Sequence, residues 1–129
     1  MNMLKLLTRK EIDEIEAIIG LDLPGDVREK YMKSNGFIGE HCELLYSYLG
    51  NTSTDIVAIN KQAQEEGWMT SHMKNLIIIG SDGIGGLIGY DHTLKQGVLW
   101  YPSEEKYEFC EASVSAVWDK VVKSYGQNS

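Results

Sequence analysis

The segment 77–91, IIIGSDGIGGLIGYD, constrains the fold more than any other part of the chain. Two apolar runs flank a turn that is dense in glycine, which adopts positive φ at little steric cost. This pattern predicts two strands joined by a tight turn. We expect Ser81 and Asp82 to hydrogen-bond to the backbone of that turn. The expected structural positions within the turn are Gly80, Asp82, Gly83 and Gly85.

The other periodic segments predict helices at both ends of the chain and short strands between them. Thr8 and Glu11 form a capping box before the first helix. Pro24 is tolerated in the first turn of the second helix, and Gly36 is expected to supply the left-handed residue that ends it. The expected helices are 8–20, 24–36, 54–67 and 114–126, and the expected strands are 43–49, 76–80, 87–91, 97–101 and 107–110.

The spacing of apolar residues indicates which helix faces lie in the core. Isoleucines recur at helical spacing in the first helix, and the last helix has the most regular stripe, in which Trp118 is expected to be buried. No crossover helix interrupts the strands of 76–110, so their sheet should be mostly antiparallel. The sequence therefore predicts one α+β domain over 1–129. The stripe residues are Ile12, Ile15, Ile18 and Ile19, then Val114, Val117, Trp118, Val121, Val122 and Tyr125.

Charge excludes one class of partner and favours another. The chain has a net charge of −7, and 36–70 carries five acids against one lysine. An acidic field repels phosphates, so direct nucleic-acid binding is not expected. The same field would orient a basic protein partner, although a merely solvated surface has an equal claim.

Location and redox state follow from what the sequence does not contain. The opening MNMLKLL is too short for a signal-peptide core, and no apolar run reaches the roughly 20 residues of a membrane span. A cytoplasmic protein is expected. Cys42 and Cys110 are then expected to be buried thiols rather than a disulfide.

No catalytic, metal or cofactor motif is complete. The glycines at 83–86 fit neither a dinucleotide fingerprint nor a P-loop, and Ser81 lacks the flanking glycine of a nucleophile elbow. The histidines, His41, His72 and His92, have no metal-binding spacing. We therefore expect no enzyme and no cofactor, with a small enzyme built on the glycine turn as the weakest alternative.

Exposed acids and aromatic residues are the candidates for partner binding. Adjacent glutamates point apart on a helix or strand, so they suit an interface rim better than acid–base catalysis. Trp100 and Tyr101 must point to opposite faces, so one of them is expected to lie away from the core. It either anchors a partner or stays partly buried against the core. The candidates are Glu40, Glu43, Glu65, Glu66, Trp100, Tyr101, Glu104 and Glu105.

Four segments in order resemble one known family. IDEIEAIIGLDLP followed by a helix ending in NG is similar to the opening of the SUKH superfamily of SMI/KNR-like domains. The 77–91 segment resembles its glycine hairpin, QGVLWY a strand of that family, and FCEASVSAVWDKVV its closing helix. The resemblance covers about 9–123. The family usually has an acidic residue at the position of Gly86 and a phenylalanine at the position of Val114, so the chain departs from the pattern at these two residues.

The resemblance implies a compact α+β protein without a catalytic centre. Many bacterial members are immunity proteins that bind and neutralise a toxin domain, often a nuclease, of a polymorphic toxin system. The leading expectation is therefore an immunity protein with a basic nuclease partner. An intracellular regulatory adaptor, like other members of the family, is the alternative.

Overall fold

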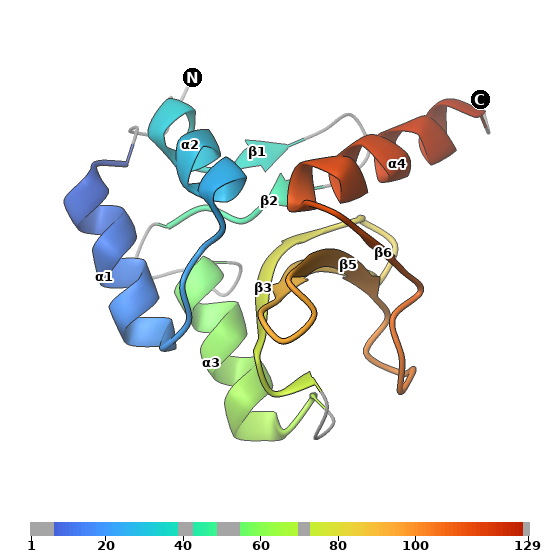
Figure 1. Cartoon of the computed structure of the whole chain (residues 1–129), viewed down its shortest axis with the longest axis horizontal. Helices are drawn as coiled ribbons and strands as arrows, with labels where there is room; N and C mark the ends of the chain where they lie inside the picture. Colours follow the sequence, from blue (N-terminus) through green and yellow to red (C-terminus); the bar gives the residue numbers. More distant parts are fainter. Residues whose placement is uncertain (1–6, 39–42, 49–54, 70–72, 128–129) are drawn as a thin grey trace.

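Helices cover two sides of a strongly curved antiparallel sheet in the computed structural model, which describes residues 7–38, 43–48, 55–69 and 73–127 (Figure 1). Helix α4 lies across the top of the sheet in this view, and α1 and α3 lie on its left. In chain order the elements are α1 (Arg9–Ile19), α2 (Gly25–Lys33), β1 (Phe37–Ile38), β2 (Glu43–Leu45), α3 (Ile56–Glu66), β3 (Leu76–Ser81), β4 (Leu87–Asp91), β5 (Gln96–Trp100), β6 (Phe109–Glu111) and α4 (Val114–Gln127).

The expected α+β class and antiparallel sheet are confirmed. The main sheet has the order β3-β4-β5-β6, and every neighbouring pair is antiparallel. A separate β1-β2 pair follows α2. It is linked to the main sheet where the backbone N–H of Tyr46 donates to the carbonyl of Ile79, 2.9 Å away. Ile79 is the extra residue of a bulge between Ile78 and Gly80, so its carbonyl is available on the outer side of β3.

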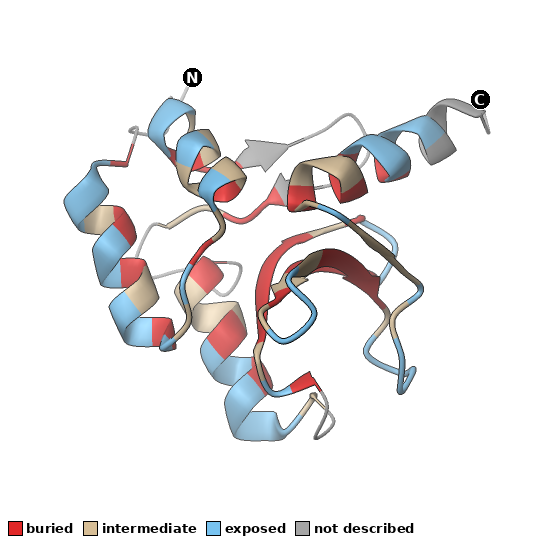
Figure 2. Ribbon diagram, in the orientation of Figure 1, coloured by how far each residue is buried: buried red, intermediate tan, exposed pale blue. Residues whose placement is uncertain are grey.

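The buried residues of every helix face the sheet or a neighbouring helix (Figure 2). Trp118 is 6% exposed, which confirms its expected place in the core. Among the stripe residues whose burial is described, which excludes Tyr125, two lie outside the core: Ile18 is 45% exposed and Val122 is 50% exposed. Each lies next to a residue that takes the inward position, because only a narrow stripe of each helix faces the core.

The crossing of α4 over β5 depends on a glycine. A Cβ atom at Gly97 would lie 2.5 Å from the carbonyl oxygen of Ser113 and 2.8 Å from the Cα of Val114. Any side chain there would push the start of α4 away from the sheet. Gly97 therefore sets how closely α4 approaches β5.

Asn60 of α3 completes the outer edge of β3. Its side-chain amide donates to the carbonyl of Ile78 (2.7 Å) and to that of Ile56 (2.8 Å), and its Oδ1 accepts from the backbone N–H of Ile78 (2.8 Å). Asn60 is fully buried. The side chain therefore replaces a neighbouring strand for this residue of β3, because an unpaired backbone group would be costly there.

Asn35 plays the same part for the segment after β2. Its side chain donates to the carbonyl of Tyr48 (3.0 Å) and accepts from the Tyr48 N–H (2.7 Å). Strand β2 ends at Leu45, so the expected strand over 43–49 was too long. Residues beyond Leu45 bond to Asn35 and to β3 instead of extending the β1-β2 ladder.

The end of α2 differs from the expectation. The helix ends at Lys33, and its C-cap Ser34 is extended rather than left-handed. Gly36 does have a positive φ of 99°, but it lies in the turn into β1, where a Cβ would be 3.1 Å from Ser47 Cβ. Gly36 is therefore needed for that turn and its close approach to Ser47, not as the helix cap.

The other predicted helix ends are mostly confirmed. The Thr8 capping box is present, Gly20 is a left-handed cap, and Pro24 is the N-cap of α2. Asp55 caps α3 through the N–H groups of its first turn. Helix α4 passes through Gly126 to Gln127, so the predicted stop at Gly126 was wrong; a glycine costs a helix about 1 kcal/mol but does not end it by itself.

We expect Asn60→Leu to lower the free energy of unfolding by about 3 kcal/mol, because it leaves the buried N–H and carbonyl of Ile78 without this partner. Urea unfolding measures the loss. Gln62→Leu on the same helix is the control, since Gln62 is exposed, and its effect should stay within about 0.5 kcal/mol. Equal losses in the two variants would contradict the role given to Asn60.

Stability should fall steeply above about pH 10, where tyrosine ionises in an unfolded chain. Burial, and then the Asp55 carboxylate, raise the pKa of Tyr31, whose hydroxyl donates to the carbonyl of Tyr46. The native state therefore keeps a proton that the unfolded state loses, and the free energy of unfolding decreases with rising pH. Tyr31→Phe should flatten this slope in urea unfolding measured between pH 8 and 11. An unchanged slope in Tyr31→Phe would contradict the role given to the Tyr31 hydroxyl.

Candidate functional site

The turn between β3 and β4 is built around the carboxylate of Asp82. Its Oδ1 accepts from the N–H of Ile84 (2.9 Å) and of Gly86 (2.7 Å), and the side chain is 2% exposed. The hydroxyl of Ser81 accepts from the N–H of Gly83 (2.9 Å). The predicted bonds from Ser81 and Asp82 to the backbone of their own turn are confirmed.

Glycines allow the turn to close on this carboxylate. Gly83 and Gly85 have φ values of 81° and 100°, as expected of structural turn positions. A Cβ at Gly86 would lie 2.3 Å from Asp82 Oδ2, which accounts for glycine where an acidic residue is usual. Gly80 is placed differently: it lies within β3, opposite Ile88 and beside the bulge.

Tyr101 ties the β5–β6 loop to this turn. Its hydroxyl donates to Asp82 Oδ2 at 2.8 Å, and its side chain stays partly exposed. Trp100 points the other way and is fully buried, with its indole N–H donating to the carbonyl of Glu104 (2.9 Å). The prediction that one of the two lies outside the core is met by Tyr101. Trp100 has no surface to offer a partner.

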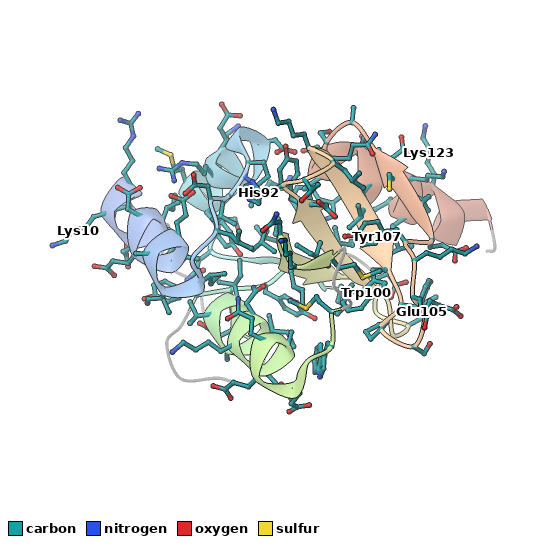
Figure 3. The ribbon with its side chains drawn as sticks, turned by 60° about the horizontal axis from the view of Figure 1, so that its bottom comes forward. Lys10, His92, Trp100, Glu105, Tyr107 and Lys123 are labelled. Atoms are coloured by element: carbon teal, nitrogen blue, oxygen red, sulfur yellow. The ribbon has the colours of Figure 1, made fainter. Side chains whose placement is uncertain are left out.

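Asp91 holds the turn at the opposite end of β4 in the way that Asp82 holds the β3–β4 turn. Asp91 is 1% exposed; its Oδ1 accepts from the N–H of Thr93 (2.8 Å) and of Leu94 (3.1 Å), and its Oδ2 accepts from the hydroxyl of Tyr107 (2.5 Å). Burial, then the hydrogen bond and charge of Asp91, raise the pKa of Tyr107 well above its usual value. Tyrosines near both ends of the β5–β6 loop thus bond to buried carboxylates. Figure 3 shows Tyr107 on the same side of the molecule as Trp100 and Glu105.

Sequence reasoning missed the pair of Asp91 and Tyr107. An aspartate at the end of a predicted strand is a turn signal, so the bonds to Thr93 and Leu94 could have been anticipated. The tyrosine could not, because it reaches Asp91 from across the sheet and 16 positions along the chain.

The predicted acidic residues do not form one cluster. Glu104 and Glu105 are exposed on the β5–β6 loop, which also contains Tyr101. Glu65 and Glu66 are exposed at the end of α3, on the other side of the lower half of the molecule in Figure 1. Side chains are not described for Glu43, and Glu40 lies outside the described residues.

Glu66 is engaged by residues near it in the chain, one within α3 and one just beyond it. Its carboxylate accepts from the indole N–H of Trp68 (3.0 Å) and from the amide of Gln62 (3.0 Å), and these bonds, the first above all, lower its pKa. These bonds hold the Glu66 carboxylate against its own chain, so it can turn toward a partner less readily than its exposure suggests.

The groups with potential for chemistry have structural roles. His92 Nε2 lies 2.6 Å from the carbonyl of Asp22, and burial, aided by Asp91 and Glu111, raises the pKa of the Cys110 thiol, which disfavours the nucleophilic thiolate. Within the part of the chain that the structure describes, no group of three or more possible metal ligands occurs. His41, Cys42 and His72 lie outside that part.

The described helices are each too short or too polar to cross a membrane.

Comparisons with known proteins gave one family. The model of the SMI1 / KNR4 family (SUKH-1) matches residues 6–120, from before α1 to within α4, and so includes the Asp82 turn and the β5–β6 loop. Neither a curated protein nor a solved structure matches the chain. Since the family match spans most of the sequence, the chain belongs to the SMI1 / KNR4 family (SUKH-1).

Proposed function

We propose that this protein is a non-catalytic immunity protein of the cytoplasm, which binds and neutralises the toxin domain of a polymorphic toxin system. Membership of a family that includes toxin immunity proteins supports this function. The observation that carries it is how the polar groups of the two turns and of the β5–β6 loop are placed. Asp82, Asp91, Tyr101 and Tyr107 bond to one another or to the backbone, and the loop that the two tyrosines attach carries exposed glutamates.

The proposed target is a basic nuclease domain. A nuclease must attract phosphates, so its cleft is usually positive, and an inhibitor with a net charge of −7 can use the same attraction. The complex would bury on the order of 800 Å² on each partner. Exposed glutamates would speed association, and buried contacts would set the lifetime of the complex.

Rescue of growth tests this function. The toxin domain encoded beside this gene is expressed in a sensitive host with and without the protein, and growth and co-purification are followed. Rescue together with a one-to-one complex is the expected result. An unrelated toxin domain is the control and should not be rescued. An active toxin that is neither bound nor neutralised would leave the regulatory adaptor as the better interpretation.

Replacing both Glu65 and Glu66 by lysine should slow association with the toxin and change dissociation less, because exposed charges act mainly on encounter. Stopped-flow or surface-based kinetics at low salt measure both rates. Unchanged kinetics would remove this pair from the interface. The same rates at high salt serve as the control, since screening should reduce the difference between the variant and the wild type.

A further inference from the structure

The tip of the β3–β4 turn carries the most exposed of the large apolar side chains that the structure describes. Ile84 is 67% exposed, against 42–50% for the others. We propose that Ile84, together with Tyr101 and the acidic β5–β6 loop, forms the surface that docks on a basic protein. This inference rests on the proposed function and names the part of the molecule that performs it.

The backbone under Ile84 is already fixed before any partner binds. Its N–H is bonded to the buried carboxylate of Asp82, which also holds Gly86 and Tyr101. Gly83 and Gly85 flank Ile84, so neither adjacent residue has a side chain to shield it. Burying a side chain on a fixed backbone costs little conformational entropy, which favours such a residue as an anchor.

Tyr101 connects this apolar tip to the acidic loop. Its hydroxyl is bonded to Asp82, and its carbonyl accepts from the N–H of Glu104 at 2.8 Å. The loop 101–108 carries Glu104, Glu105 and Glu108 against Lys106. An apolar anchor with an acidic margin thus forms at one end of the sheet.

The β4–β5 turn provides an internal comparison, because it has the same construction. Asp91 holds it as Asp82 holds the other, and Leu94 at its tip is 49% exposed. Geometry and exposure therefore do not by themselves decide between the two tips.

Charge decides between them. Leu94 is followed by Lys95, and Lys74 precedes Asn75, whose amide bonds to the Thr93 hydroxyl (2.9 Å). Asp22, near His92, offsets only one of these two lysines. With the Asp91 carboxylate of the turn counted as well, the charges around Leu94 balance, so a basic partner is attracted more strongly to the acidic surface at Ile84. A second copy of this chain is disfavoured at the Ile84 surface as well, since it would place acidic loops together.

The Ile84 surface is tested with the toxin domain of the rescue assay as the probe. Ile84→Asp should raise the Kd for that domain at least about tenfold, as expected for a central apolar anchor. Leu94→Asp is the matched control: it adds the same charge to the same kind of turn and should change the Kd less than about twofold. Thermal unfolding checks that both variants are folded, and Ile84→Ala, which adds no charge, should weaken binding in the same direction.

The acidic margin has its own matched pair of variants. Reversing Glu104 and Glu105, or Glu65 and Glu66, to lysine changes the net charge equally, from −7 to −3. A general effect of charge would slow association equally in both. We expect the variant with lysines at 104 and 105 to associate with the toxin domain about tenfold more slowly, at low salt, than the variant with lysines at 65 and 66.

The outcomes separate the surface from the function. If the wild type binds the toxin domain but Ile84→Asp binds as tightly, or Leu94→Asp is the weaker binder, the surface is wrong and the function stands. If the wild type forms no complex with an active toxin domain, both are wrong. Sedimentation of the free protein reports self-association, and a dimer that Ile84→Asp dissociates would overturn the choice of partner.

Discussion

The carboxylate of Asp82 holds two segments as one unit, and the candidate site exists because of it. One oxygen accepts from the backbone of the β3–β4 turn, and the other accepts from Tyr101 at the start of the β5–β6 loop. Hydrogen bonds to a carboxylate are stronger than those between neutral groups, and burial at 2% exposure keeps water from competing for them. Without this group the turn would lose its support, and the loop would lose the hydrogen bond that attaches Tyr101.

Side chains also replace missing strands at the edges of the fold. Asn60 and Asn35 each present an amide to a backbone segment and satisfy both its donor and its acceptor. An extended segment with free backbone groups invites pairing with another chain. At these positions the chain covers the exposed backbone with an amide from a helix or from a residue just beyond one. The short β1-β2 pair and the main sheet can therefore remain separate ladders in one core.

The fold was largely predictable from local signals, and the candidate site was predictable only in part. The capping box at Thr8, the Asp82 turn and the stripe at Trp118 depend on nearby residues, so the sequence alone places them. Two of the wrong predictions concern long-range contacts. The burial of Trp100 depends on the path of a loop that covers it, and the extended cap at Ser34 depends on Asn35 bonding to Tyr48, 13 positions away. The resemblance to the SUKH superfamily predicted the fold correctly, because the pattern of a family reflects contacts between segments that lie far apart in the sequence.

Glu104 takes part in the fold through its backbone: its N–H bonds to Tyr101 and its carbonyl to Trp100, while its side chain is exposed. The shape of the loop at this position is therefore independent of which side chain stands there. New side chains can be tried at such a position without a new fold to accommodate them, because folding and recognition draw on different atoms of the same residue. A protein built in this way can change the partner that this loop recognises while each variant still folds.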